Sequence, residues 1–149
     1  MARHPRWVRR FLSDADLEAV ARAVAETETR TSGEIRVHLD ATCAGDPLRR
    51  AVAVFERLGM HRTSQRNGIL VYLAIEDRKL AVIGDAEVHA RVPDDYWPRL
   101  TATLADRCRA GRPQDGLITV VRDVGELLSR HFPHRPDDRN ELSDEVSLG

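Results

Sequence analysis

The sequence predicts an α/β fold, in which helices cover both faces of a mixed sheet, and three observations support this prediction. The segment 34–40, EIRVHLD, follows an amphipathic helical segment and alternates apolar with polar residues, as a strand does. The run ILVYLAI at 69–75 is continuously apolar, which indicates a strand buried on both faces. The polar turn 76–78 is so short that the next strand, KLAVIG at 79–84, is expected to pair antiparallel with this run.

The helix before the first strand is predicted to run from Ser13 to about Arg30. Ser13 is a favourable N-cap, and Asp16 stands at the third helical position, where it can complete a capping box. The apolar residues that follow recur every three or four positions and form a single apolar face. Gly33 ends the helix directly before the strand.

The second helix is predicted to begin at Pro47, with Asp46 as its N-cap, and to continue to about His61. Its expected inner face consists of the apolar residues Leu48, Val52, Phe55, Leu58 and Met60. Because a helix joins the strands 34–40 and 69–75, these strands are expected to be parallel and linked by a right-handed crossover.

Two helices are predicted after the hairpin, over residues 94–111 and about 114–131. The first has an apolar face that comprises Tyr96, Trp97, Leu100, Leu104 and Ala105. The Val-rich start of the second, GLITVV, would also suit a strand, but the apolar residues continue at helical spacing and favour a helix. Pro133 and Pro136 then impose an extended exit.

Length and composition indicate one domain, with a core over about 12–136 and an acidic C-terminal loop over 137–149. The 149 residues are 42% hydrophobic and carry a formal net charge of −1, so neither nucleic acid nor an anionic membrane is an expected partner. The sequence identifies no protein partner. It has neither the apolar run of about 20 residues that a membrane helix needs nor a leader segment, so a cytoplasmic location is expected. Cys43 and Cys108 are expected to be reduced thiols.

The C-terminal stretch 137–145 is rich in side chains that carry oxygen. They are Asp137, Asp138, Asn140, Glu141, Asp144 and Glu145. Hard cations such as Ca²⁺ and Mg²⁺ take carboxylate and amide oxygens as ligands, so this stretch is a candidate metal-binding loop. The EF-hand pattern is absent, because no Gly occupies the turn, and acidic C-termini are commonly solvated. The apolar residues Val146 and Leu148 suggest that the tail packs onto the domain.

Connectivity brings three further polar residues to one end of the predicted sheet. The strand 79–84 runs antiparallel to its predecessor, so Asp85 is expected near Asn67, which precedes that strand, and near Glu34, which begins the first strand. Their oxygens also suit a cation. Asp85 can equally be a turn residue or a helix cap, and Glu34 can be an exposed strand end.

The sequence contains no motif that assigns a catalytic residue. GxSxG, P-loop, GxGxxG and HExxH patterns are absent, and the six histidines are scattered without the spacing of zinc ligands. Clustered acids with a bound metal can activate water for phosphate hydrolysis, but no nucleophile or base stands out in this sequence.

Five stretches, taken in order, carry a resemblance to a known family. They are TSGEIRVHLD (31–40), RNGILVYLAIEDRKLAVIGD (66–85), VPDDYW (92–97), DGLITVV (115–121) and HFP…DDRNELSDEV (131–146). Together they cover about Leu12 to Val146, and the chain resembles the TPM domain in its short stand-alone bacterial form. The resemblance implies an αβα sandwich with a central mixed four-stranded sheet.

The resemblance also implies bound Ca²⁺ or Mg²⁺, at one or two sites formed by crossing loops. The ligands that it implies are Asp85, from the Gly-Asp turn, and Asp138, Asn140, Glu141, Asp144 and Glu145, from the tail. Glu34, in the Gly-Glu-Ile motif, is a further candidate. Residues 86–90 depart from the family pattern, because Glu87 stands where the family has Gly and Ala90 where it has an acid. As a hypothesis, Glu87 substitutes for the lost acid.

Three functions are implied by the resemblance. The favoured one is a non-catalytic domain whose cations pin loops to the sheet edge, with a regulatory or structural role. The second is a metal-dependent phosphatase, because a thylakoid member of the family has been described as an acid phosphatase. The third is a protein-interaction module, because membrane-anchored members work in the assembly or repair of larger complexes.

Overall fold

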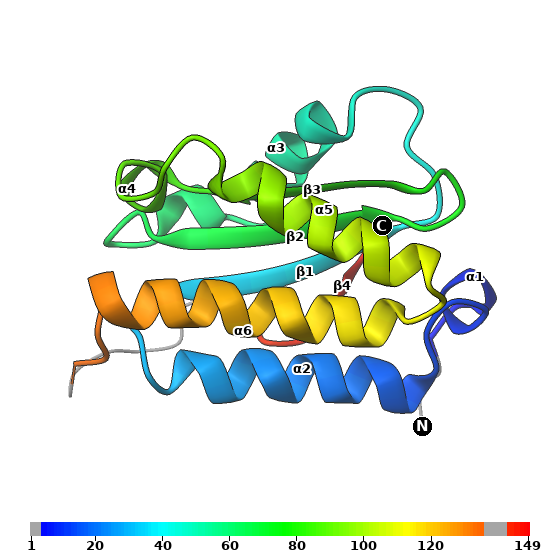
Figure 1. The fold of residues 1–149 in the computed structure, drawn as a ribbon, viewed down its shortest axis with the longest axis horizontal. Coiled ribbons are helices and arrows are strands. Elements are labelled where there is room, and N and C mark those ends of the chain that lie inside the picture. Colours follow the sequence, from blue (N-terminus) through cyan, green and yellow to red (C-terminus); the bar gives the residue numbers. More distant parts are fainter. Residues whose placement is uncertain (1–3, 136–142) are drawn as a thin grey trace.

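The computed structural model describes residues 4–135 and 143–149, and it contains a mixed four-stranded sheet with helices on both faces (Figure 1). The strands are β1 (Glu34–Asp40), β2 (Gly68–Ala74), β3 (Lys79–Gly84) and β4 (Ser147–Leu148), in the order β3-β2-β1-β4. β1 pairs parallel with β2 and with β4, whereas β2 and β3 are antiparallel. The predicted α/β fold and the predicted pairing of the first three strands are confirmed.

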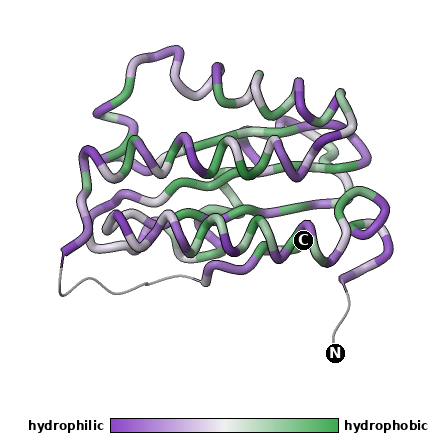
Figure 2. Tube along the Cα trace, turned by 60° about the horizontal axis from the view of Figure 1, so that its bottom comes forward, coloured by the Kyte–Doolittle hydropathy of each residue, from purple (hydrophilic) through white to green (hydrophobic). Residues whose placement is uncertain are grey.

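Three long helices cover one face of the sheet, and a fourth covers part of the other. The helical elements are α1 (Arg6–Arg9), α2 (Asp14–Glu28), α3 (Pro47–Arg57), the 3-10 turn η1 (Met60–Arg62), α4 (Ala86–His89), α5 (Tyr96–Arg109) and α6 (Pro113–His131). The larger core lies between the sheet and α2, α5 and α6, and the smaller one lies beneath α3. Along the helices, hydrophobic and hydrophilic residues alternate as expected for one-sided burial (Figure 2). No helix in the described ranges is long and apolar enough to cross a membrane.

β1 has one apolar and one polar face. Ile35, Val37 and Leu39 point into the larger core, where each is buried. The alternate side chains point to the opposite face, and they are Glu34, Arg36, His38 and Asp40. On this face α3 packs mainly on β2 and β3. β1 therefore carries a row of buried or half-buried polar groups, which must be satisfied by partners other than the apolar core.

The local signals at the helix starts are confirmed. The Ser13 side chain accepts the Asp16 N–H, and the Asp16 carboxylate accepts the Ser13 N–H, which completes the capping box of α2. Asp46 caps α3, and Pro47 is its first residue. The free thiols of Cys43 and Cys108 agree with the predicted reduced state.

The predicted length of the second helix is wrong, and its predicted inner face is confirmed only in part, because Phe55 is buried but Leu48 and Val52 are not. Leu48 and Val52 are 53% and 44% exposed, whereas Ala51 and Val54 are buried against the sheet. The residues of α3 allow two overlapping apolar stripes, and the small Ala51 lets the helix approach the sheet on the other one. The helix also ends at Arg57, because Gly59 takes a left-handed conformation with φ 73° before η1 begins.

Residue patterns did not predict the short elements, and one of these is the fourth strand. β4 lies in the acidic tail and pairs His38 with Ser147 and Leu39 with Leu148. Val146 and Leu148 pack against the larger core, so the described end of the tail folds back onto the domain as predicted. Two residues are too few for periodicity to identify a strand, and the resemblance alone implied it.

Candidate functional site

Polar residues gather at the end of the sheet where β1 and β2 begin and β3 ends. Glu34 lies opposite Gly68 in the ladder, and the Asp85 N–H donates to the Gly68 carbonyl oxygen at 2.9 Å. Asn67, which directly precedes Gly68, is buried and donates to the Ser32 hydroxyl. The register thus brings Glu34, Asn67 and Asp85 to one end of the sheet, as the connectivity predicted.

Asp85 is committed to contacts within the protein. Its two carboxylate oxygens accept from Arg66 Nε and Nη2 at 2.9 and 3.0 Å, and the Ala86 N–H donates to the same carboxylate at 2.7 Å as the N-cap of α4. Burial raises the pKa of Asp85, but the hydrogen bonds from Arg66 and Ala86 outweigh it and hold this pKa below its usual value. A cation at Asp85 must therefore compete with the guanidinium of Arg66.

A second group of carboxyls surrounds the last turn of α2. The Glu28 carboxyl accepts the Ile35 N–H at 2.7 Å, and it lies beside Asp144 from the tail and Glu34 from β1. Burial raises the pKa of Glu28 to about 10, with contributions from a hydrogen bond with Asp144 and from the charges of Glu34 and Asp144. The raised pKa favours the protonated form of Glu28 at neutral pH. We call Glu28, Glu34 and Asp144 the acidic cluster.

Arg36 adds a positive charge next to the acidic cluster. Burial lowers its pKa, whereas the negative charges of Glu28, Asp144 and Glu145 raise it in part. Its Nε atom is buried without a hydrogen-bond partner among the described groups. This guanidinium therefore offsets part of the negative charge of the nearby carboxyls.

The predicted ligands are only partly brought together. Glu34 and Asp144 each lie near Glu28, Glu145 is exposed and lies near Arg36, and Asp85 is held by Arg66. The candidates Asp138, Asn140 and Glu141 lie outside the described residues. Within residues 4–135 and 143–149, no group of three or more His, Cys, Asp or Glu side chains is arranged to hold a metal ion. The acidic cluster fits a hard cation by its ligand chemistry, but further oxygens are needed to complete a site.

Glu28 was missed by the sequence analysis. Its only signal is an acid in the last turn of a helix, where the negative end of the helix dipole disfavours a carboxylate. An unfavourable charge at that position is a sign of a tertiary partner, but the sequence does not name Asp144 as that partner.

The opposite end of β1 carries a saturated polar network. Asp40 accepts Tyr72 Oη at 2.6 Å, Arg50 Nε at 2.7 Å and Nη2 at 3.2 Å, and His38 Nε2 at 2.9 Å. Because the carboxylate can only accept, Nε2 of His38 carries the proton and Nδ1 accepts from the Ser147 hydroxyl at 2.9 Å. Burial lowers the pKa of His38, although Asp40 opposes this shift. The network ties β4 to β1 and leaves Asp40 no free lone pair for a cation.

The fold and the acidic end of its sheet define a small αβα domain whose C-terminal strand returns along β1. The family model described as the TPM domain matches residues 8–127, and the chain therefore belongs to the TPM domain family. The structure is similar to the NMR structure of the BA42 protein from the psychrophilic bacterium Bizionia argentinensis, with a TM-score of 0.85 and 35% identity over 93% of this chain and 96% of that one.

A more distant similarity supports the fold alone. The N-terminal domain of the cg2496 protein from Corynebacterium glutamicum has a TM-score of 0.62 and 15% identity, with 86% of each chain covered. No curated protein matches this chain. The predicted family and the predicted αβα sandwich with a mixed four-stranded sheet are confirmed.

Proposed function

We propose that this chain is a divalent-cation-binding TPM domain, in which Ca²⁺ or Mg²⁺ joins the acidic tail to the end of the sheet. The observation that carries the proposal is the acidic cluster, in which the partly buried carboxyl of Glu28 lies beside Glu34 and Asp144, and burial together with these two neighbours raises the pKa of Glu28. A divalent cation among these oxygens stabilises all three as carboxylates and disfavours the protonated form of Glu28. The further ligands that the resemblance implies, Asp138, Asn140 and Glu141, lie outside the described residues.

The proposed role is structural or regulatory, because cation binding is linked to the position of β4. Asp144 precedes Ser147 by three residues, and Ser147 pairs with His38 at the edge of the sheet. A cation that holds Asp144 to Glu28 and Glu34 therefore fixes the tail three residues before β4 begins. Cation occupancy favours the docked tail, and its loss weakens that docking through the same contacts.

Thermal unfolding in Ca²⁺, in Mg²⁺ and in EDTA tests the proposal. A cation that binds only the folded chain adds about 2.7 kcal/mol at a free concentration of about 100 times Kd. We expect an increase of several degrees in Tm relative to EDTA, together with changes in the amide resonances of residues 143–146. Asp144→Asn removes one ligand charge and is expected to abolish most of the increase.

Asp106→Asn is the matched control, because Asp106 is an exposed acid on α5 that pairs with Arg109. It is expected to keep the full response to cation. Equal Tm values in Ca²⁺, Mg²⁺ and EDTA would contradict cation binding. A full increase of Tm with cation in Asp144→Asn would instead show that the cation binds outside the acidic cluster.

The phosphatase alternative stays a prediction with its own test. A metal-dependent phosphatase predicts turnover of a generic phosphoester that is lost in Asp85→Asn. We expect no turnover above the blank in Ca²⁺ or Mg²⁺, because Arg66 and the Ala86 N–H already occupy the Asp85 carboxylate. A metal-dependent rate that disappears in Asp85→Asn, with folding unchanged, would favour the enzyme.

A further inference from the structure

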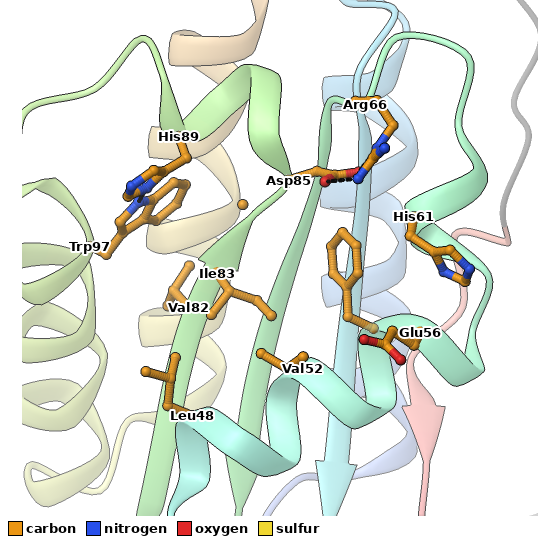
Figure 3. A pocket seen from close by; sticks show the side chains of 12 residues that line it. Leu48, Val52, Glu56, His61, Arg66, Val82, Ile83, Asp85, His89 and Trp97 are labelled. Atoms are coloured by element: carbon orange, nitrogen blue, oxygen red, sulfur yellow. Dashed lines mark hydrogen bonds and ion pairs between the residues drawn. The ribbon is translucent and has the colours of Figure 1, made fainter.

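A groove of about 510 Å³ lies along the outer edge of β3 (Figure 3). Its α3 wall is formed by Leu48, Val52 and Phe55, and its floor by Val82, Ile83 and Gly84 of β3. Trp97 of α5 lines the other side. We call this feature the β3 edge groove.

The backbone of β3 is open to a further strand on the groove side. The hydrogen bond from the Asp85 N–H to Gly68 sets the phase of the antiparallel ladder, so the N–H and C=O groups of Leu80, Val82 and Gly84 point away from β2. In the described part of the chain, no segment other than β2 makes a backbone hydrogen bond to residues 79–84. At the opposite edge, β4 already adds to β1 in this way.

The walls of the groove belong to both faces of the sheet. Val82 and Ile83 are adjacent in β3 and therefore point to opposite faces, yet both line the groove. Val82 lies with the larger core on the side of Trp97, and Ile83 lies with the smaller core on the side of α3. A strand added to β3 presents alternate side chains to these two walls, whereas a compact ligand on one face contacts only one of them.

The α3 wall offers apolar surface that the domain itself does not cover. Leu48 is 53% and Val52 is 44% exposed, and no other large hydrophobic residue in the described ranges is exposed. Both belong to the helix face that the sequence analysis assigned to the core. Apolar side chains next to an open strand edge are a known hazard for aggregation, so a bound segment that covers both is a physically favourable arrangement.

The charge on the rim indicates which segment fits. Arg66 and Asp85 form an ion pair and cancel one another. Glu56 is exposed on the rim and has no ion pair with any described residue, so the formal charge of the lining is −1 with His61 and His89 neutral. A Lys or Arg in the occupant complements Glu56, and an acidic residue there is repelled.

We propose that the β3 edge groove binds an extended segment of a partner protein, which adds to β3 as a further strand. The segment carries apolar side chains at alternate positions and one Lys or Arg near Glu56. Five residues from Leu80 to Gly84 leave an edge of about 17 Å, which suits a strand of ordinary length. This mode of recognition combines main-chain hydrogen bonds with pockets for alternate side chains. It does not depend on the proposed cation site.

Titration of the isotope-labelled full chain with capped peptides of about six residues tests the proposal. The probes carry Val, Ile, Leu or Phe at alternate positions, Thr between them, and Lys or Arg at one end. We expect saturable shifts and slower amide exchange at Leu80, Val82 and Gly84, in Ca²⁺ and in EDTA alike. A central Pro in the peptide removes a donor and is expected to abolish binding, and Glu in place of the basic residue is expected to weaken it.

Val52→Glu places a charge on the α3 wall and is expected to weaken binding about tenfold or more. Ala53→Glu is the control, because Ala53 is an exposed residue of the same helix that does not line the groove. Both variants are expected to keep the unfolding midpoint of the wild type in urea. An Ile83→Val variant, which keeps the apolar wall, is expected to bind as the wild type does.

Other outcomes overturn the proposal. If no probe binds at about 1 mM, or if the shifts fall outside the groove, the segment is not a ligand of this edge. Binding that tolerates a central Pro indicates a compact ligand and not a strand. A dimer in light scattering that dissociates in Val52→Glu indicates that a second copy of the chain covers the edge.

Discussion

Asp40→Ala is expected to lower the free energy of unfolding by about 3 kcal/mol or more, because it removes the acceptor at the centre of a buried network. Tyr72 and His38 are fully buried, and both donate to Asp40. Without the carboxylate their donors lose their partner, and the guanidinium of Arg50 loses its counter-charge. Urea unfolding near neutral pH measures the effect.

The pH dependence of the stability lost in Asp40→Ala distinguishes the loss of the charged network from a loss of packing. Burial raises the pKa of Asp40, but hydrogen bonds from Arg50, Tyr72 and His38 outweigh it and hold this pKa below the usual 3.8. The folded state therefore binds fewer protons than the unfolded state near that pH. The stability that Asp40 contributes is present above 3.8 and is lost as the pH falls below it.

Asp106→Ala is the control for this experiment, because it removes an exposed ion pair with Arg109 that is worth about 1 kcal/mol or less. The difference between wild type and Asp40→Ala is expected to shrink in acid, whereas the difference for the control stays small throughout. A loss in Asp40→Ala no larger than that of the control would contradict the structural role of the network.

Glu28→Gln is expected to stabilise the metal-free protein in mild alkali. The pKa of Glu28 is raised from 4.5 to about 10, so the stability that its neutral form contributes is fully present below 4.5 and is lost as the pH rises toward 10. Gln resembles the protonated acid and can still accept from the Ile35 N–H. At about pH 8 in EDTA we expect a gain above about 1.4 kcal/mol, the equivalent of one pKa unit.

The slope of the free energy of unfolding against pH is the most direct measurement of the raised pKa of Glu28. Wild-type stability in EDTA is expected to fall between about pH 5 and 9, and Glu28→Gln is expected to flatten that fall. Glu26→Gln is the matched control, because Glu26 is exposed on the same helix and its change is expected to leave the slope intact. Parallel profiles for wild type and Glu28→Gln would show that Glu28 is ionised in the folded chain.

The same variant also separates the pKa of Glu28 from the proposed cation. A divalent cation is expected to stabilise wild type more than Glu28→Gln, because the amide cannot supply a charge. If Glu28→Gln flattens the slope of stability against pH but no cation stabilises the wild type, the raised pKa of Glu28 is supported and cation binding is contradicted. The two outcomes are therefore distinguishable in one set of unfolding curves.

Most long elements were predictable because their signals are local. The capping box at Ser13 and the Asp46-Pro47 start of α3 depend on neighbours within one helical turn. β1 was predicted with its observed ends, because alternation over seven residues has no helical counterpart. For the candidate site, the sequence placed Glu34 and Asp85 at one end of the sheet from connectivity alone.

The remainder depends on which surfaces meet. The apolar residues of α3 would let either of two overlapping faces of the helix pack on the sheet. In the structure Ala51 packs on the sheet, and this orientation leaves Leu48 and Val52 exposed. The contact between Glu28 and Asp144 joins residues more than a hundred positions apart. The residues next to either of them in the sequence give no sign of this contact.

The sequence by itself determined the secondary structure of the long elements, the parallel and antiparallel pairing of three strands, and the family. These follow from periodicity, capping and connection length, which act over a few residues. Only the tertiary structure decided which carboxyls lie together, which edge of the sheet the tail covers and which apolar side chains stay exposed. Those outcomes depend on burial and charge between distant segments, and the energies of such contacts exist only once the chain has packed.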